Sequence, residues 1–362
     1  MTAAYDFAVV GGGVAGVTLA LELARRRASV VLLESGPGPA GASTVPAALL
    51  NPHRGRTARA RPTDLAGLAA TWRLVAELEA KGLDHGARRS GVLRVASNAR
   101  QAKLWAELAT VTEGALWLHP ADVPAPVNAP FGALEVVDGG YVDTRTFLSA
   151  VMAAAVQEGA SVHTLTRVRG IQESAGLLTI EASQEPRGGS ARDGLDAAAA
   201  SATPTERILA LHAVLCVGAG AAPPGCRLPR LRAEGGVAAV LEPPAEAAAE
   251  LARLSPLAGA VNASFFPGSV VVTGGSLPAE RPAEDALHTA ALGLRDALSW
   301  SVPALARAKL LSAWFGVRSR RQTGVPVLRR LAPRVTYYGG LAGRGFLCAA
   351  DLSAKLAERL LA

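Results

Sequence analysis

A glycine-rich turn near the start of the chain constrains the fold more than any other stretch. The apolar residues 7–10 lead into Gly11, Gly13 and Gly16, and residues 14–27 continue with helical periodicity. In such a strand–turn–helix unit Gly11 allows the turn, Gly13 lets the backbone approach a pyrophosphate, and Gly16 lets helix and strand pack closely. The pattern therefore predicts a dinucleotide-binding unit whose helix N-terminus is directed at the phosphates.

An acidic residue follows the next predicted strand. The predicted second strand, residues 29–33, is followed by Glu34, at about the distance where the dinucleotide fold places the acid that receives the ribose hydroxyl pair. An acid at this position argues against a 2′-phosphate. A βαβ unit that binds nothing is the alternative, but strand, helix, second strand and acid occur here together. We therefore expect a bound dinucleotide, whose identity depends on the rest of the chain.

The composition narrows the class of protein. The chain has 362 residues, enough for a large core or two interleaved domains, and 50% are hydrophobic but only 4% aromatic, so Ala, Leu and Val must build the core. Its three cysteines show neither metal-ligand spacing nor a disulfide framework, which favours a reducing compartment. No apolar stretch reaches the ~18 residues of a membrane span. We expect a cytoplasmic protein with no metal site.

The charge balance favours anionic partners. The formal charge is +7, and arginine supplies most of the excess. One basic cluster covers residues 53–61 and another covers residues 318–334. Such clusters suit a carboxylate substrate, flavin phosphates or RNA. The alternative is that most of these arginines lie in solvated loops.

The C-terminal segment repeats the strand–turn–helix pattern. Residues 335–338 are a predicted strand, residues 339–345 a glycine-rich turn and residues 346–361 a helix. A fold that closes its nucleotide domain with its own last helix uses both chain ends on one ligand. That arrangement favours a flavin dinucleotide, which is long and bound almost wholly inside the protein, over NAD.

The middle of the chain predicts further strands. Residues 208–217 form a strongly apolar run that ends in glycines at 218 and 220 and suits an internal strand. Residues 237–241 and 270–273 are short β-type runs, which we assign to an antiparallel sheet outside the nucleotide fold. Residues 184–206 are rich in Gly, Ser, Ala and Pro and predict a flexible hairpin loop.

These motifs, taken in order, resemble those of the FAD-dependent amino-acid oxidase (DAO) superfamily, which includes D-amino-acid oxidase, glycine oxidase and sarcosine oxidase. The resemblance extends over essentially the full length. It is carried by Gly11-Gly-Gly-Val-Ala-Gly16 with Glu34, Ala213-Val-Leu-Cys-Val-Gly-Ala-Gly220, Arg232-Ala-Glu-Gly-Gly236, and Gly316-Val-Arg318 followed by Gly324-Val-Pro326. The tail, Gly340-Leu-Ala-Gly-Arg-Gly-Phe-Leu-Cys-Ala-Ala350, looks most similar to the oxidoreductase half of the bifunctional enzyme that makes 5-methylaminomethyl-2-thiouridine in tRNA.

The resemblance implies an α/β fold with two interleaved domains. A Rossmann-like FAD-binding domain of the GR2 type, with a parallel sheet, would comprise residues 1–85, 140–232 and 312–362. A substrate domain of mixed or antiparallel sheet plus helices would comprise residues 86–139 and 233–311.

The resemblance and the glycine turns together indicate which residues contact FAD. They are Gly11, Gly13, Val14, Ala15, Gly16, Glu34, Ser35, Ser43, Ala47, Ala48, Leu49, Val168, Gly218, Ala219, Gly220, Gly343, Arg344, Gly345 and Phe346. Small side chains at residues 47–48 would let a flat ring lie close to the backbone. Cys348 could attach the flavin covalently, but a cysteine on an Ala/Leu-rich helix is usually a small packing residue, so we expect FAD to be bound non-covalently.

The implied reaction is oxidation of the C–N bond of a small amino acid or secondary amine, with hydride transfer to flavin N5 and hydrolysis of the resulting imine. Arg318 matches the family's carboxylate-binding arginine, which fixes the substrate by two parallel hydrogen bonds; the alternative is a surface ion pair. Arg344 could face the flavin or the substrate, or it could face solvent. His53, which follows Asn51, could tune protons at the site or be solvated. We nominate no general base, because a neutral amine needs none.

Two other functions stay open beside a small amine substrate that carries a carboxylate. The tail and the arginine clusters fit a tRNA-modifying oxidoreductase that removes the carboxymethyl group from a carboxymethylaminomethyl-uridine, in which case tRNA is a partner. The remaining alternative is a non-catalytic flavoprotein that binds another protein.

Overall fold

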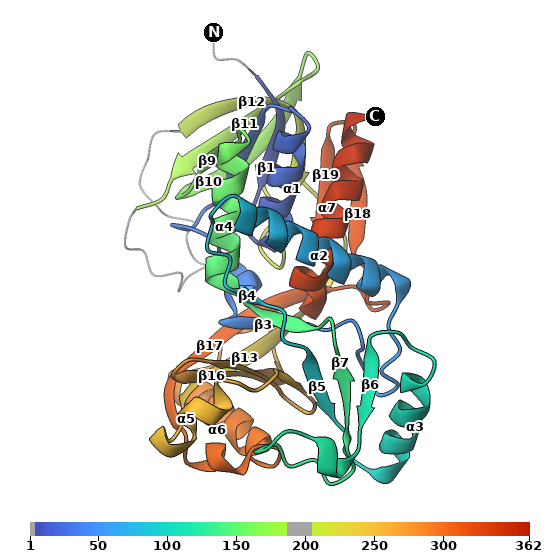
Figure 1. Cartoon of the computed structure of the whole chain (residues 1–362). Helices are drawn as coiled ribbons and strands as arrows, with labels where there is room; N and C mark the ends of the chain where they lie inside the picture. The colour runs from blue at the N-terminus through green and yellow to red at the C-terminus, as the bar shows by residue number, and fades with distance from the viewer. Residues whose placement is uncertain (1–3, 187–204) are drawn as a thin grey trace.

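A computed structural model describes residues 4–186 and 205–362, and most of its strands form two large sheets that occupy opposite ends of the molecule (Figure 1). The first sheet runs in the order β10-β11-β12-β1-β2-β9, and β19, with β18 beyond it, pairs with the C-terminal half of β12. The first-sheet strands are β1 (Tyr5–Val10), β2 (Val30–Leu33), β9 (Ser161–His163), β10 (Thr166–Ser174), β11 (Leu177–Gln184), β12 (Thr205–Leu215), β18 (Val327–Ala332) and β19 (Val335–Gly339).

The centre of the first sheet is parallel and buried, as the near-continuous apolar runs predict. β1 pairs in parallel with β2 on one side and with β12 on the other, and β2 is buried along its whole length. Val10 lies opposite Leu215 and Leu33, so the C-terminal ends of these three strands meet at one edge. That edge is where open α/β sheets bind their ligands.

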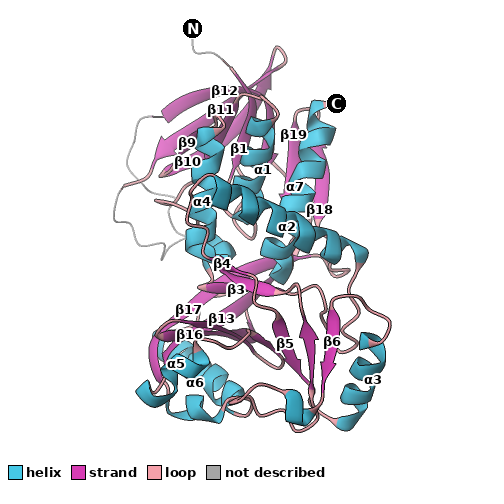
Figure 2. Cartoon of the chain, in the orientation of Figure 1, coloured by secondary structure: helices cyan, strands magenta, loops and turns pink. Residues whose placement is uncertain are grey.

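Helices cover the first sheet, and those from the two ends of the chain pack against each other. α1 (Val14–Arg25) packs between α4 (Thr144–Gln157) and α7 (Gly345–Leu361), and α2 (Pro62–Ala80) crosses them (Figure 2). Their shared core consists mainly of Ala, Leu and Val, as the composition predicts. The buried hydroxyls of Thr18 in α1 and Ser353 in α7 are hydrogen-bonded at 2.8 Å. The first and last helices of the chain therefore close the same domain.

The second sheet is antiparallel except for one parallel pair, β14 with β5, and runs β17-β13-β16-β15-β14-β5-β7-β6. Its strands are β5 (Val92–Val95), β6 (Ala115–Leu118), β7 (Ala133–Val136), β13 (Arg232–Glu242), β14 (Leu257–Ala258), β15 (Asn262–Phe266), β16 (Ser269–Leu277) and β17 (Lys309–Arg320). The helices on this side are α3 (Ala99–Ala109), α5 (Ala245–Leu251) and α6 (Glu284–Ser299). α6 packs on β13, β16 and β17 and closes a second hydrophobic core.

A small third sheet lies between the two large ones (Figure 1). It contains β3 (Ala47–Leu50), β8 (Gly140–Asp143) and β4 (Ala87–Arg88). The Tyr141 hydroxyl in β8 donates a hydrogen bond of 2.7 Å to the carbonyl of Phe265 in β15. This buried contact attaches the third sheet to the second.

The α/β class, the parallel centre of the first sheet and the antiparallel second sheet are confirmed, whereas β10 with β11, β11 with β12 and β18 with β19 form antiparallel pairs at the margins of the first sheet. The expected domain boundaries stay a prediction. β17 pairs with β13 along its length, so residues 312–320, expected in the FAD-binding part, lie in the second sheet. The predicted flexible loop at residues 184–206 falls mostly on residues 187–204, which lie outside the described residues; Gln184 ends β11 and Thr205 begins β12.

In the described ranges no helix has the length and apolarity to cross a bilayer. A cytoplasmic location stays a prediction.

We expect stability to fall on acidification because of His212 in β12. Its Nε2 lies 2.9 Å from the Thr336 hydroxyl, and burial, with Arg330 and Arg334 nearby, lowers its pKa to about 4. The folded state holds the imidazole neutral, whereas the unfolded chain takes up a proton below pH 6.5. This contribution to stability is therefore lost as the pH falls from 6.5 toward 4.

The measurement is the Tm across that pH window for the protein and for His212→Gln, which should lose less. Replacing the exposed His288 of α6 by glutamine is the control and should leave the slope unchanged. Equal slopes for the protein and the His212 variant would contradict the assignment.

Candidate functional site

The glycine turn after β1 has the geometry that a phosphate-binding turn needs. Gly11 has a φ of 107°, in the left-handed region, and its N–H donates to the Leu33 carbonyl at 2.8 Å. A Cβ on Gly16 would lie 1.8 Å from the Gly11 carbonyl oxygen, so only glycine allows this approach of α1 to the strand. Gly13 is the N-cap residue, and the first turn of α1 carries no acidic side chain. The helix N-terminus can therefore receive a phosphate.

Glu34 lies beside this turn with its carboxylate fixed. The residue is 5% exposed. Oε2 accepts the Gly12 N–H and Oε1 accepts the Gly36 N–H, each at 2.6 Å, and the Ser35 hydroxyl donates to Oε1 at 3.2 Å. An ionised carboxylate offers further lone pairs, so these bonds leave room for a ribose hydroxyl pair.

Two other predicted segments reach the same edge of the first sheet. The backbone N–H of Thr166 donates to the Glu34 carbonyl at 2.8 Å, which brings the start of β10, and with it Val168, close to the acid. The stretch from Gly218 through Ala219 to Gly220 follows β12, whose C-terminal end lies next to that of β1. The structure therefore gathers the turn, the acid and these segments in one place.

The segment 43–49 links the turn to the second sheet. The Ser43 hydroxyl accepts the Val14 N–H at 3.1 Å, directly at the start of α1, next to Ala15. The neighbouring Thr44 accepts a hydrogen bond of 3.3 Å from Trp314 Nε1 in β17. In β3, Ala47 is buried, Ala48 packs on the first core, and Leu49 packs on a small cluster of the second sheet.

The C-terminal turn, η4 (Ala342–Arg344), leads into α7 at Gly345. The Phe346 side chain is buried and meets the Phe147 ring edge-on, with ring centroids 5.9 Å apart. Gly343 has no bulky neighbour: the closest atoms to a Cβ built there are arginine nitrogens at 3.5 and 3.6 Å.

Arg344 does not face solvent, which was one of its two predicted orientations. It is 9% exposed, and Nη1 forms an ion pair of 2.8 Å with Asp64, which is also buried. Its Nη2 donates to the Gly324 carbonyl. The first turn of α2 places Asp64 against the C-terminal turn, so the guanidinium holds that turn in position.

Arg318 is the freer of the two predicted arginines. Its side chain on β17 is 33% exposed, Nη2 lies 3.8 Å from Glu234 Oε1 and 3.5 Å from the Gly275 carbonyl, and Nε has no hydrogen-bond partner. Glu234 makes its closer ion pair, 2.8 Å, with Arg320. The guanidinium of Arg318 lies over Gly236, where a Cβ would come within 3.2 Å of Nη2. It is therefore held loosely and can bind an anion.

Sequence reasoning missed Arg54 as a single site residue and placed it only in a basic cluster. A Cβ on Gly343 would lie 3.5 Å from Arg54 Nη2 and 3.6 Å from Arg318 Nη1, so both guanidinium groups reach the C-terminal turn. An isolated bridge between Arg320 and Leu341 brings the end of β17 to this turn. No local sequence pattern predicts contacts between segments that lie so far apart in the chain.

His53 and Cys348 are buried packing groups. His53 is 2% exposed, so the solvated alternative is wrong; Nδ1 lies 2.8 Å from the Ala58 carbonyl, and the Asn51 side chain accepts the His53 N–H at 2.9 Å. Burial lowers the pKa of His53, and Arg94 lowers it further. Burial, with Asp64 nearby, raises the pKa of the Cys348 thiol to about 12, which keeps it protonated.

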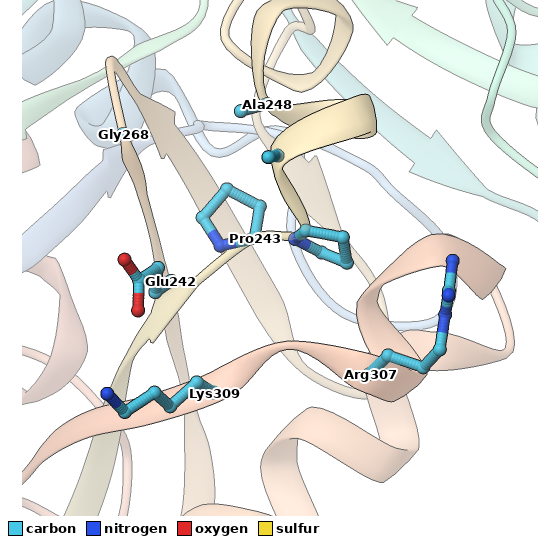
Figure 3. A pocket seen from close by; sticks show the side chains of 8 residues that line it. Glu242, Pro243, Ala248, Gly268, Arg307 and Lys309 are labelled. Carbon is cyan, nitrogen blue, oxygen red and sulfur yellow. The ribbon is translucent and has the colours of Figure 1, made fainter.

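An open hollow of about 400 Å³ lies elsewhere, at the far end of β13 (Figure 3). Its lining includes Glu242, Lys309 and Arg307 but none of the predicted site residues. Glu234 and Glu242 are eight residues apart on one strand, which corresponds to roughly 25 Å. The hollow is therefore separate from the arginine site.

Replacing Glu34 by alanine should raise the Kd for FAD about 10- to 100-fold. The change removes the ribose acceptor and leaves the Gly12 and Gly36 N–H groups without their carboxylate, and a hydrogen bond to a charged group contributes roughly 1.5–3 kcal/mol. Flavin fluorescence titration of the apoprotein measures this Kd. Glu79→Ala, an exposed change on α2, is the matched control. An unchanged Kd would remove Glu34 from the cofactor site.

Comparisons with known proteins agree with this geometry. The family described as FAD dependent oxidoreductase (DAO) matches residues 6–359. Glycine oxidase of Geobacillus kaustophilus is 28% identical over 187 residues, 48% of this chain and 50% of that protein. The tRNA 5-methylaminomethyl-2-thiouridine biosynthesis bifunctional protein MnmC of Maricaulis maris is 27% identical over 364 residues, 98% of this chain and 52% of that protein. The matches thus span about half the length of these curated relatives.

Solved structures share the fold over nearly the whole chain. The crystal structure of glycine oxidase from Geobacillus kaustophilus has a TM-score of 0.78 at 22% identity and covers 99% of this chain and 95% of that one. Iminodiacetate oxidase from Chelativorans has a TM-score of 0.74 at 20% identity, with 98% and 95% coverage. Because the family match extends over nearly all residues, the protein belongs to the DAO family of FAD-dependent oxidoreductases, and FAD is its cofactor.

Proposed function

We propose that the protein oxidises the C–N bond of a small amino acid or secondary amine and that Arg318 binds the substrate carboxylate. The observation that carries this is the loosely held, partly exposed guanidinium of Arg318 beside the C-terminal turn, whose one nearby carboxylate among the described residues, Glu234, lies 3.8 Å away and pairs more closely with Arg320. A planar guanidinium can bind a carboxylate by two parallel hydrogen bonds, which fixes the direction of the C–N bond.

The chain's own residues would hold the cofactor around this position. We assign the pyrophosphate to the Gly11–Gly16 turn, the ribose to Glu34 and the flavin end to the residues of the C-terminal turn and β3. FAD supplies the acceptor for the hydride that leaves the substrate carbon. In this assignment Arg344 is a positioning residue, because its guanidinium forms an ion pair with Asp64.

We assign the two tasks to the two large sheets. Residues 1–85, 140–232 and 321–362 would bind FAD, and residues 86–139 and 233–320 would recognise the substrate. The boundary at 320 follows the pairing of β17 with β13. Arg318 would then be presented to the flavin side by the substrate part.

The test is anaerobic reduction of the bound flavin. The purified holoprotein is mixed with glycine, sarcosine, iminodiacetate and a set of D-amino acids, and the visible flavin absorbance is followed. We expect at least one of these amines to bleach the flavin and to yield the carbonyl product after hydrolysis. A flavin that chemical reductants reduce but none of these donors does would favour a non-catalytic role.

A second candidate function is supported by the MnmC relatives, one of which matches 98% of this chain. In that case the substrate is a carboxymethylaminomethyl-uridine in tRNA, and the exposed residues Arg56 and Arg61 would contact phosphates. Phosphate contacts make RNA affinity fall steeply with salt. Absence of tRNA binding at low salt would exclude this candidate.

A further inference from the structure

We propose that the site takes an amine with two carboxylates and that Arg54 binds the second one. This inference deepens the proposed function and rests on it, since it takes Arg318 as the site of the first carboxylate. The substrate class is that of N-carboxymethyl amines whose other arm also ends in a carboxylate.

The first argument is the place of the Arg54 side chain. Arg54 Nη2 and Arg318 Nη1 approach the same side of Gly343, at 3.5 and 3.6 Å from the position of a Cβ there. The two arginines come from different parts of the fold: Arg54 follows β3, and Arg318 lies on β17 of the second sheet. Two cations therefore converge on one point of the C-terminal turn.

The second argument is the distribution of the neighbouring carboxylates. Asp64 forms an ion pair of 2.8 Å with Arg344. Glu234 forms an ion pair of 2.8 Å with Arg320, and its other carboxylate oxygen lies 3.8 Å from Arg318. Within residues 4–186 and 205–362, no carboxylate lies at ion-pairing distance from Arg54. Arg54 thus has cationic neighbours and no anion of its own.

The third argument is electrostatic. Partial desolvation lowers the pKa of Arg54, which still keeps part of its surface in contact with solvent, and the charge of Arg344 lowers it further, with Arg318 acting in the same direction; Asp64 acts against them. Guanidinium groups remain charged in proteins, so their mutual repulsion persists. A single carboxylate can satisfy one guanidinium bidentately, whereas a dianion relieves the repulsion at both.

The reaction would proceed on the arm held by Arg318. The carbon between that carboxylate and the nitrogen would give up its hydride to the acceptor that FAD supplies when bound. The nitrogen lone pair forms the C=N bond, and water then cleaves the imine to an oxoacid and the remaining amine. Arg54 acts on the other arm, so its contribution is to affinity and orientation.

The experiment uses two unreactive ether analogues and the bound flavin as the reporter. Diglycolate carries two carboxylates and methoxyacetate one, and each is titrated into the holoprotein while the flavin spectrum is recorded. We expect diglycolate to bind at least about 10-fold more tightly, as one added charge-assisted contact implies. Arg54→Gln should remove this preference and leave the methoxyacetate affinity unchanged.

Arg59→Gln is the matched control, because Arg59 is exposed in the same loop and the substitution removes the same charge. It should keep the preference of the unmodified protein. A preference that survives in Arg54→Gln, or falls equally in Arg59→Gln, would overturn the inference. Methoxyacetate binding without a diglycolate preference refutes the second subsite alone, whereas no spectral response to either ligand refutes the carboxylate site at Arg318 as well.

Discussion

Arg318→Gln should lower kcat/KM for the amine substrate by about 100- to 1,000-fold while the protein keeps its FAD. The estimate comes from losing two charge-assisted hydrogen bonds to a carboxylate, each contributing roughly 1.5–3 kcal/mol and not fully additive. Arg318 lies on β17 in the second sheet, and its contacts are with that sheet and the C-terminal turn rather than with the Gly11–Gly16 turn. FAD content should therefore be unaffected.

The measurement is the rate of anaerobic flavin reduction against substrate concentration, together with FAD content. Arg318→Lys keeps the charge but loses the parallel pair of donors, so its loss should be intermediate. Arg329→Gln, an exposed change on β18, removes the same charge and should behave as the unmodified protein. A glutamine variant that reduces its flavin at the normal rate and substrate concentration would place the carboxylate site elsewhere.

Local sequence patterns predicted the glycine turn between β1 and α1 and the acid after β2, because the geometry of these features is set by short-range chemistry. Gly11 and Gly16 are fixed by a turn and a close backbone approach within six residues, and Glu34 follows the very next strand. Apolar runs in the parallel strands are near-continuous because both faces are covered. These are properties that a single stretch of sequence carries.

The arginine site could not be predicted in the same way, because its partners are distant in sequence. Asp64 and Arg344 form their ion pair across 280 residues, and nothing near either residue signals the other. The convergence of Arg54 and Arg318 on Gly343 likewise depends on how β17 meets the C-terminal turn. Family resemblance identified Arg318, but residue type and spacing alone could not distinguish it from a surface arginine.

Weak periodicity explains the strands that sequence reasoning left out. β14 has only two residues, and β6, β7 and β15 have four or five, too few for an alternating pattern to stand out. The expected boundary at residue 312 came from the resemblance motif Gly316-Val-Arg318, whereas the backbone pairing of β17 with β13 places these residues in the second sheet.

Gly16→Ala should produce a protein that binds no FAD and unfolds at a much lower temperature. A Cβ at this position would lie 1.8 Å from the Gly11 carbonyl oxygen and 3.1 Å from its carbon, and both are backbone atoms that cannot rotate away. Relief requires α1 to move off β1, which also moves the helix N-terminus from the phosphates. Overpacking typically costs about 1–3 kcal/mol, and a clash with backbone should reach or exceed the upper end.

The matched substitution is Gly38→Ala, in the loop after β2, where nothing lies within 4 Å of an added Cβ. It changes the same residue type by one methyl group, so it controls for the loss of glycine flexibility. Thermal unfolding and the flavin-to-protein absorbance ratio measure both effects, and Gly38→Ala should match the unmodified protein in each. If Gly16→Ala retained FAD and its Tm, the close packing of α1 on β1 could not be what holds the cofactor, and the assignment of the phosphates to this turn would be wrong.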